Sequence, residues 1–474
     1  MARFGMLLAG FMAVVNISII YLALPSIERA LHAGIAEQQW ILSVYPLMEG
    51  GFTLAAGTLG DLYGRKLILS LTTVLFVLAT LGCALAPNAA VLIAMRGLQG
   101  LGGAALLSLP VAILVQMLPD PSDNEETIKT FSTVAGLGAV AGPLIGGVAV
   151  RFFGWPSVFY LSVIMGAAVL ATLPFVRESE RNPSLRLDAA GQMLSIFSFL
   201  AISFALIEGN TIGWSSFPIL GAFALSVLGF SLFLRVERRA AQPMIHLRYF
   251  KLRTFDVSLL TIGTINFGWY GIMLLCTLFL QNALHQSPML AGLYLMPSNI
   301  AFFIANLYSS TIQNRIGERA ILIASFAISL CGIAWLGTLG AGSHPWGVAA
   351  GLFVAGIGWG LIFTPAASLG MGAVEAADEG FASGAIALSR SLFGVFGIAI
   401  LGSVLSAALH RAGAQGFPAG LHAALIVAFA VTSVFGVAVA CLAPVRAASS
   451  KPHAKPFAHY AFRFRHAAKA SSAR

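Results

Sequence analysis

Long apolar runs, separated by short polar or charged segments, recur along almost the whole chain. An α-helix needs about 20 mostly apolar residues to cross a bilayer, and each run is close to that length. In lipid every backbone polar group must be bonded internally, which favours helices, and the alternation typical of membrane β-barrels is absent. The pattern predicts an all-α polytopic membrane protein with about fourteen spans. We place them at 5–25, 40–60, 67–86, 90–117, 128–150, 156–176, 188–208, 214–234, 257–281, 289–312, 319–339, 346–368, 384–409 and 420–443.

Composition and charge agree with this class and predict an orientation. Of the 474 residues 58% are hydrophobic and 9% charged, whereas soluble proteins carry about 25% charged residues. The net charge of +9 lies mainly in loops and in the tail beside the apolar runs, which argues against a nucleic-acid partner. Lys and Arg gather in the loop 235–256 and in the tail, so the positive-inside rule predicts that both termini are cytoplasmic. The loop 118–127 is acidic, but acids contribute little to that rule.

The loops divide the spans into two comparable groups. The segments 177–187 and 235–256 bracket the seventh and eighth spans, and without that pair six spans remain on each side. Two such halves are typical of transporters that rock one bundle against the other. We therefore expect an N-terminal six-helix bundle at 1–176, a linker with two accessory helices at 177–254, a C-terminal six-helix bundle at 255–444 and a basic cytoplasmic tail at 445–474.

A charged, glycine-rich segment joins the second and third spans. It reads GTLGDLYGRK and contains Gly57, Asp61, Gly64, Arg65 and Lys66. Its glycines permit a tight turn, and its charges can pair with each other or with a neighbouring helix end. Such contacts can form in one state of a transporter and break in another. A shorter echo, NRIGER, follows the tenth span and contains Arg315.

Two further patterns lie inside the predicted spans. The fourth span contains Arg96-Gly97-Leu98-Gln99-Gly100, and an arginine there costs roughly 2.5–3.5 kcal/mol on insertion scales unless it faces a polar cavity or a partner. The fifth span reads GAVAGPLIGG, with Gly138, Gly142, Pro143, Gly146 and Gly147. Small residues four apart permit close helix contact, and a proline bends the helix.

These three patterns resemble motifs of the major facilitator superfamily, and within it those of the fourteen-helix drug:proton antiporters. The family patterns are G-x-L-a-D-r-x-G-r-k, R-x-x-Q-G and G-x-x-x-G-P-x-x-G-G; Leu62 departs from the first. The resemblance covers about residues 5–444 and implies the major facilitator fold. It implies a gating role for Gly57, Asp61, Gly64, Arg65, Lys66 and Arg315, and places Arg96 in proton relay. A loop that only sets topology, and an arginine that reaches toward the outer interface, are the alternatives.

The first span departs from the family pattern D-x-T-I-V-N-V-A-L-P. Counted back from Pro25, Asn16 stands where the family has an acid and Tyr21 where it has an asparagine. An amide does not carry a proton at physiological pH, so the proton site does not transfer. Glu49, near the middle of the second span, is the candidate replacement, because burial favours its neutral form and lets it take up protons. We expect it to be coupled to Arg96; the alternative is a protonated acid that only bonds a neighbouring helix.

Polar and aromatic residues at depth suggest a substrate cavity. An aromatic, weakly polar cavity would suit lipophilic or cationic organic molecules. Helix packing and the interfacial aromatic belt are the alternative explanations of each such residue. The candidates are Asn16, Tyr21, Gln99, Asn266, Tyr270 and Asn299.

These observations together predict a secondary transporter of the bacterial inner membrane. We expect it to export drugs or metabolites in exchange for protons by alternating access; the helix-five motif marks exporters in the family it resembles. No Walker motif supports an ATP-driven pump, and scattered histidines without an HExxH pattern argue against an enzyme, so no metal or cofactor is expected. The partners are substrate, protons and lipid, while a periplasmic adaptor and the oligomeric state are left open. The rivals are an uncoupled or differently coupled carrier and a receptor-like protein that does not transport.

Overall fold

The computed structural model describes residues 1–117, 124–182, 188–239, 245–340, 342–375 and 378–443. The predicted tail at 445–474 and most of the acidic loop lie outside them. The described residues form helices and no strand. In chain order the main helices are α1 (Ala2–Ile19), η1 (Ile20–Ala23), α2 (Leu24–Leu31), α3 (Ile35–Tyr63), α4 (Arg65–Ala84), α5 (Ala89–Gly103), α6 (Ser108–Gln116), α7 (Asn124–Phe153), α8 (Ser157–Thr172), α9 (Ala189–Ile212), α10 (Phe217–Glu237), η4 (Leu247–Lys251), α11 (Arg253–Leu278), η5 (Phe279–Ala283), α12 (Pro288–Ile316), α13 (Glu318–Leu336), α14 (Pro345–Met371), α15 (Glu379–Ala412) and α16 (Phe417–Leu442).

The predicted all-α polytopic fold is confirmed. Among the described residues, 13 helical stretches are long and apolar enough to cross a membrane. The second predicted span, α3, is not one of them, because Glu37, Glu49, Asp61 and neighbouring glutamines lower its hydropathy. It nevertheless has 29 residues and lies inside the bundle between α5 and α15. The described residues therefore form a multi-pass membrane protein with 13 clearly apolar helical stretches, and α3 is a further, less apolar helix packed between them.

Two predicted spans are each built from two helical pieces. The span at 5–25 ends in the 3₁₀ turn η1 followed by α2, whose first turn contains Pro25. The span at 90–117 is interrupted at 104–107, between α5 and α6. Pro110 follows that break, and its missing N–H removes the backbone bond that would join this turn to the preceding one. Hydrophobicity alone does not reveal such breaks, since the flanking residues are equally apolar.

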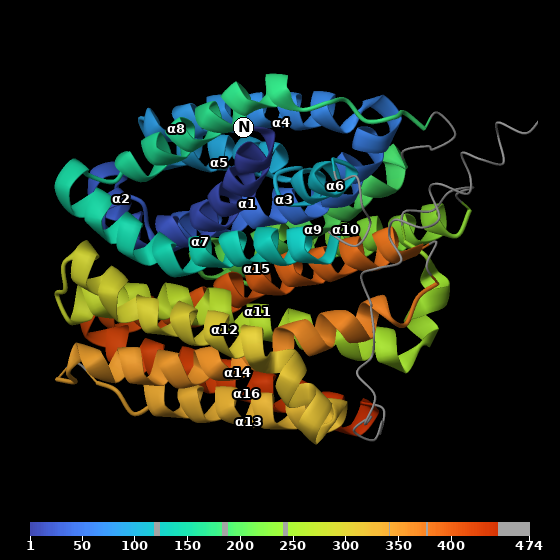
Figure 1. The fold of residues 1–474 in the computed structure, drawn as a ribbon. Helices are drawn as coiled ribbons and strands as arrows, with labels where there is room; N and C mark the ends of the chain where they lie inside the picture. Colours follow the sequence, from blue (N-terminus) through green and yellow to red (C-terminus); the bar gives the residue numbers. More distant parts are fainter. Residues whose placement is uncertain (118–123, 183–187, 240–244, 341, 376–377, 444–474) are drawn as a thin grey trace, which may run out of the picture.

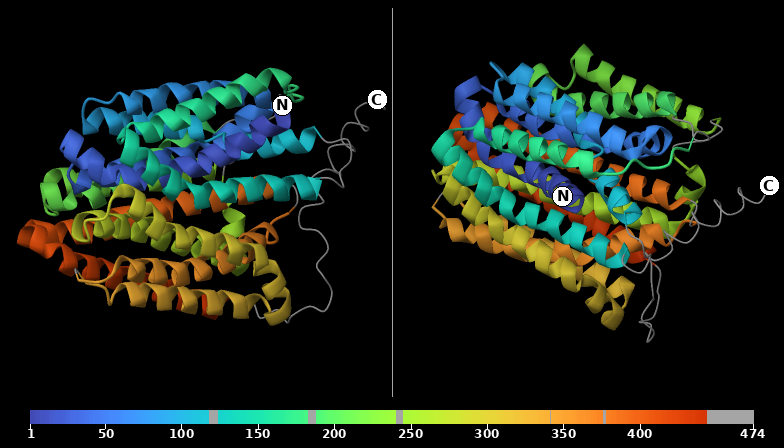
Figure 2. Two further views of the ribbon diagram at one scale, coloured as in Figure 1. Left: turned by 60° about the vertical axis from the view of Figure 1, so that its left-hand side comes forward. Right: turned by 45° about the horizontal axis from the view of Figure 1, so that its top comes forward.

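The helices form two groups that pack side by side. Figure 1 shows α1 to α8 in the upper part and α11 to α16 in the lower part, and the left view of Figure 2 keeps this division. The groups contact each other mainly through two helix pairs, α3 with α15 and α7 with α12. We call the end of the bundle that contains Gly64 the hinge end, and the opposite end, which contains residues 32–34, the far end.

The helix α9 contacts both groups. It packs on its hairpin partner α10 and also on α3 and α15. Toward α3, Gln192 donates to the carbonyl of Gly51, and Trp40 Nε1 donates to Glu208 Oε1 at 2.9 Å. Toward α15, the Asn210 amide donates to the carbonyl of Ser403 at 2.6 Å. The pair α9–α10 is therefore bonded to the bundle by specific polar contacts and is more than a lipid-facing addition.

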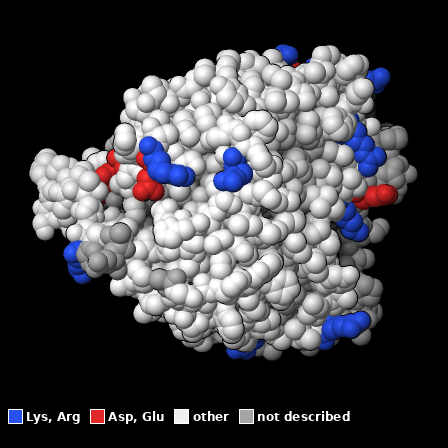
Figure 3. All heavy atoms as spheres, turned by 90° about the vertical axis from the view of Figure 1, so that its left-hand side faces the viewer, with Lys and Arg blue, Asp and Glu red and all other residues white. Residues whose placement is uncertain are grey.

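The surface agrees with a position in lipid. Figure 3 views the molecule from the left-hand side of Figure 1, onto the far end of the bundle, and there Lys, Arg, Asp and Glu form only small separate groups. Large apolar side chains are exposed along the helices, for example Leu78, Val227 and Ile426. In water such a surface would be unfavourable, whereas hydrocarbon accepts it.

Close helix contact at glycine predicts a matched pair of stabilities. A Cβ at Gly397 on α15 would overlap with the carbonyl oxygen of Phe267 on α11, whereas one at Gly221 on α10 meets open space. We expect Gly397→Ala to lower the free energy of unfolding by about 1–3 kcal/mol, because backbones must move apart. Gly221→Ala should be neutral or slightly stabilising. Thermal unfolding of both purified variants in detergent tests this, and equal stabilities would contradict the packing described.

Candidate functional site

Arg96 lies at the centre of a polar cluster inside the first group of helices. Its side chain is 1% exposed. Its Nε donates to the carbonyl of Ile41 on α3 at 3.1 Å, and its NH1 donates to Asn16 Oδ1 on α1 at 3.0 Å and to Gln99 Oε1 on α5 at 2.6 Å. The guanidinium also lies over the ring of Tyr45, 4.5 Å from the ring centre. Arg96 thus binds α1, α3 and α5 together.

A second set of contacts surrounds this cluster. The amide of Gln99 donates to Thr80 Oγ1 on α4 at 2.7 Å, and the amide of Asn16 donates to Ser162 Oγ on α8 at 3.3 Å. Asn16 is the residue that replaces the expected acid, and its oxygen accepts from Arg96 where a carboxylate would otherwise do so. These hydrogen-bonding acceptors of Arg96 are all uncharged.

Glu49 lies on α3 beside this cluster and is 2% exposed. Neither of its oxygens has a hydrogen-bond partner. The charges that act on its carboxyl group are those of Arg390 on α15, which has the larger effect, and of Arg96. No hydrogen bond joins Glu49 to Arg96 in this structure, and the expected coupling between them stays a prediction. Arg390 had not been selected from the sequence, although its position within the apolar run 384–409 is the kind of signal that singled out Arg96.

The glycine-proline motif of α7 lies between α1 and α12. A Cβ at Gly138 would contact Phe11 of α1, and one at Gly146 would contact Ile19. On the other side Gly147 lies against the backbone of Pro288 and Met289, while Gly292 of α12 lies against the carbonyl of Pro143. Gly142 lies against Ser18. The motif thus brings three backbones close together, near the far end of the bundle.

The predicted substrate residues divide into two sets. Tyr21 and Asn299 line a small cavity of about 10 Å³ between the two groups, together with Ser18, Leu22, Pro143, Trp269, Met273 and Leu295. Asn16 and Gln99 are instead bonded to Arg96, and the amide of Asn266 donates to the carbonyl of Ile262 on its own helix. Tyr270 contributes its carbonyl, which accepts from the Tyr21 hydroxyl at 3.3 Å. Met273 and Leu295 are apolar, so a search of the sequence for polar residues at depth does not find them as cavity residues.

This cavity has only a small fraction of the volume of typical ligand sites, which occupy about 300–1,000 Å³, so it has no room for an organic substrate in the present state. The two groups meet above it toward the far end, where Gln281 donates to the carbonyl of Leu22 at 3.3 Å and Gln39 donates to the carbonyls of Ile398 and Ala399, both at 2.8 Å. Beyond these contacts lies an open basin of about 610 Å³, lined by α2, Arg151 and residues 281–288. The arrangement is therefore closed toward the far end.

The hinge segment between α3 and α4 is held by the segment that follows α8. Gly64 has a φ of 110°, which favours glycine, and ends α3. Asp61 and Arg65 form an ion pair at 2.9 Å, and Arg65 NH1 donates to the carbonyl of Ala112 on α6 at 3.3 Å. The carboxylate of Glu178 accepts from the backbone N–H groups of Lys66 and Leu67, at the positive N-terminal end of α4.

The sequence echo after α12 has the same backbone break. Gly317 has a φ of 88° and separates α12 from α13, as Gly64 separates α3 from α4. Arg315 lies in the last turn of α12 and is exposed. Gly57, which begins the first hinge motif, has open space where a Cβ would lie. The two breaks occupy corresponding places in the second and third helices of each group.

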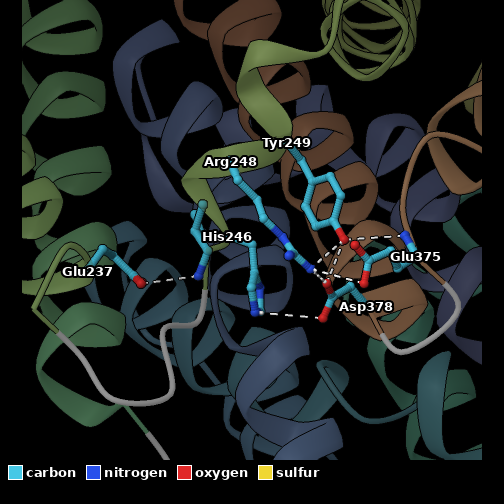
Figure 4. A network of polar contacts seen from close by, with 7 residues as sticks. Glu237, His246, Arg248, Tyr249, Glu375 and Asp378 are labelled. Atoms are coloured by element: carbon cyan, nitrogen blue, oxygen red, sulfur yellow. Dashed lines mark hydrogen bonds and ion pairs between the residues drawn. The ribbon is translucent and has the colours of Figure 1, made fainter.

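A polar network that sequence reasoning missed joins η4 to the loop before α15 (Figure 4). Asp378 accepts from Arg248 and from the hydroxyl of Tyr249, the latter at 2.6 Å, and lies 3.7 Å from His246 Nε2. Glu375 lies 3.6 Å from Arg248. The ring of Tyr249 also stacks on that of Phe381, while His246 contacts Phe381 edge-on and Tyr249 at a tilt. The residues lie far apart in the sequence and match no spacing pattern, so only the fold brings them together.

Hydrogen bonding sets the ionisation of Asp378. Partial burial alone would raise its pKa, but the hydrogen bonds from Tyr249 and Arg248, together with the nearby His246, lower it below the usual value. The pKa of Tyr249 is raised, first by burial and then by its bond to Asp378. The carboxylate of Asp378 is therefore the form that holds η4 against the loop.

The comparisons with known proteins agree with this geometry. The family model of the Major Facilitator Superfamily matches residues 6–398, most of the chain. The chain belongs to the Major Facilitator Superfamily. This confirms the family resemblance on which the hinge, Arg96 and helix-five motifs were interpreted, and members of the superfamily are transporters.

Two relatives from Mycobacterium tuberculosis illustrate the branch of the superfamily. The multidrug resistance protein Stp is 36% identical over 398 residues, which cover 84% of this chain and 74% of Stp. The drug efflux pump JefA is 32% identical over 429 residues, covering 89% and 84% of the two chains. Among solved structures, a peptide transporter POT in complex with sulfate superposes with a TM-score of 0.67 over 93% of this chain and 95% of the other. Its 16% sequence identity supports the superfamily fold alone.

The Arg96 cluster predicts unequal effects of two asparagine substitutions. Asn16→Leu removes an acceptor from a buried guanidinium and should lower the free energy of unfolding by about 1–3 kcal/mol. Asn266→Leu is the matched control, because its amide donates to a carbonyl of its own helix, and it should cost less. Thermal unfolding in detergent measures both. Equal losses would mean that Arg96 does not depend on Asn16.

The network in Figure 4 predicts a stability difference that depends on pH. Because the pKa of Asp378 is lowered in the folded protein, its stabilising contribution is present above the titration range of a free aspartate and is lost as the pH falls through the folded value. Asp378→Asn should therefore lower the melting temperature at pH 7 and have a smaller effect at acid pH. Glu375→Gln is the control, since Glu375 is exposed and more distant from Arg248. An Asp378 effect that did not change with pH would contradict this assignment.

Proposed function

We propose that this protein exports small organic compounds, of the drug or metabolite class, across the bacterial inner membrane in exchange for protons. The names of Stp and JefA describe drug resistance and drug efflux, which supports export of such compounds by this related chain. The observation that carries the proton-coupled part is Glu49, a buried carboxyl group without a hydrogen-bond partner at the contact between the two helix groups.

Alternating access follows from the way the two groups meet. We infer that residues 1–176 and 255–444 rock against each other, with 177–254 supplying the accessory pair. Contacts such as Gln281 with Leu22 and Gly147 with Pro288 close the far end in the present state. Export requires these contacts to open while the hinge ends approach, so the hinge at Asp61 and Arg65 would then find partners outside its own group.

The orientation belongs to the same proposal. The hinge end carries Arg235, Arg248 and Lys251, the start of α1 and the end of α16, and the positive-inside rule assigns such an end to the cytoplasm. The far end, with its open basin, would then face the periplasm. In this orientation the present state is closed to the outside.

Glu49 provides the ionisable carboxyl group that the first span lacks. Asn16 occupies the place of the usual acid and is bonded to Arg96, so it neither binds nor releases protons. A carboxyl group in a water-poor site favours its neutral form, and nearby guanidinium groups oppose that preference. Glu49 has both features and can therefore exchange protons as its access to either side changes.

A second candidate is a carrier that is uncoupled from protons. The specific observation that favours it is the complete set of uncharged acceptors around Arg96, which would need no titrating partner. In that case Glu49 would remain permanently protonated.

The test compares Glu49→Gln with wild type in everted membrane vesicles energised by a proton gradient. With ethidium as the first probe and a panel of uncharged and cationic antibiotics after it, wild type should accumulate at least one compound. Glu49→Gln should lose at least about 90% of the gradient-driven part while it keeps exchange without a gradient.

Glu208→Gln is the matched control. It also removes a carboxylate from a spanning helix, but its amide oxygen can still accept from Trp40, so transport should persist. Gradient-driven transport that is unchanged in Glu49→Gln would exclude Glu49 as the proton carrier. Substrate flux in wild type that persists after the proton gradient is collapsed would favour the uncoupled carrier.

A further inference from the structure

The surroundings of Glu49 include a residue from the other helix group. Gly50 follows Glu49 on α3, and a Cβ at Gly50 would overlap with the side chain of Ser391 on α15. The residue before Ser391 is Arg390. The two helices are therefore in close contact at the level where the carboxyl group and this guanidinium lie.

Both residues have unused hydrogen-bonding capacity. Glu49 Oε1, Glu49 Oε2 and Arg390 Nε are buried atoms without a hydrogen-bond partner. The effect of the Arg390 charge on Glu49 is larger than that of Arg96. Arg96 in contrast donates to three acceptors of its own helix group, so it is fixed there whatever the state of Glu49.

The remaining groups around Glu49 are weaker influences. Tyr45 on the same helix and Tyr270 on α11 are neutral phenols, and each interacts electrostatically with both Glu49 and Arg390. Of the other helices packed on α3, α6 has no titratable residue, and Cys83 of α4 interacts with the Arg96 charge. The charged residues of α4 and α9 lie near the helix ends, at Arg65, Lys66 and Glu208.

We propose that Arg390 is the residue of the C-terminal half that responds to the protonation state of Glu49. The inference rests on the proposed role of Glu49 and adds the partner across the interface. When Glu49 is ionised, its attraction to Arg390 holds α3 and α15 together. When Glu49 takes up a proton, that attraction disappears and two guanidinium groups from opposite halves face a common site without an intervening anion. Protonation thus changes the force between the halves, which is what coupling to rocking requires. Arg390 acts through Glu49 and is a positioning residue.

The test measures the protonation of Glu49 directly. Infrared absorbance of protonated carboxyl groups is followed against pH in the purified full-length protein in detergent, and the signal that Glu49→Gln removes is assigned to Glu49. Removing a nearby positive charge makes the ionised carboxylate less favourable, so Arg390→Gln should move the midpoint upward by roughly one pH unit. Arg390→Lys should retain a midpoint near that of wild type. Arg315→Gln, which removes an exposed arginine at the hinge end, is the matched control and should cause no shift.

The same variants are then assayed for transport in everted vesicles with the probe that wild type accumulates. The pH profile of gradient-driven transport by Arg390→Gln should shift in the same direction as its infrared midpoint. In a Glu49→Gln background, the exchange that remains without a gradient should have the same pH profile with and without Arg390→Gln. A folded Arg390→Gln protein with a wild-type midpoint would overturn the proposal. A merely structural role would lower the rate without shifting the midpoint.

Two outcomes separate this inference from the proposed function. If Glu49→Gln abolishes coupling while Arg390→Gln shifts nothing, only the role of Arg390 fails. If Glu49→Gln transports normally, the proton-carrier role fails, and the midpoint comparison still tests the contact. If Arg390→Gln does not fold, the stability of the double variant Glu49→Gln/Arg390→Gln is the test. The double variant should be more stable than Arg390→Gln alone, because it leaves no unpaired carboxylate. Equal instability of the two variants would contradict the pairing of Glu49 with Arg390.

Discussion

The burial of the Arg96 guanidinium is the constraint on which the N-terminal half depends. Removing such a cation from water is costly, and the chain offsets this cost with hydrogen bonds that Arg96 donates to the carbonyl of Ile41, to Asn16 and to Gln99. These acceptors lie on three helices, so the charge can be satisfied only if α1, α3 and α5 hold one arrangement. Since the acceptors are neutral, they stabilise the cation without cancelling its charge, and that uncancelled charge acts on Glu49.

The contacts between the halves have a different character. Side-chain amides reach the main chain of the opposite half, as Gln39 does at Ile398 and Asn299 at Ala139. Within hydrocarbon an amide that loses such an acceptor finds no water to replace it. Under the proposed rocking of the halves, each contact has to be exchanged for another, so both conformations must supply acceptors. The helix α9 takes part in this exchange because it is bonded to α3 and to α15.

Sequence reasoning predicted the spans and the family because both depend on local signals, namely apolar length and motifs of consecutive residues. It also selected Glu49 and Arg96 correctly as buried, since a charge inside an apolar run has to be accommodated. It did not bring Arg390 to Glu49 or His246 to Asp378, because those pairs are joined by the packing of helices more than a hundred residues apart. It also missed the break at 104–107, where the residues are as apolar as their neighbours. Asn16 was treated as a missing acid, whereas its oxygen completes the hydrogen bonding of Arg96.

The seal near the far end is made by main chain rather than by side chains. At Gly147 and Gly292 the backbones of α7 and α12 touch because neither residue has a side chain. Every substitution at these positions adds atoms, so variation in the sequence can loosen this seal but cannot tighten it. Residues that line the cavity, such as Trp269, Met273 and Leu295, can change in size and polarity in both directions, so under the proposed function we expect adaptation to new substrates there and not at the seal. The architecture separates the part that must stay invariant for tightness from the part that is free to diversify.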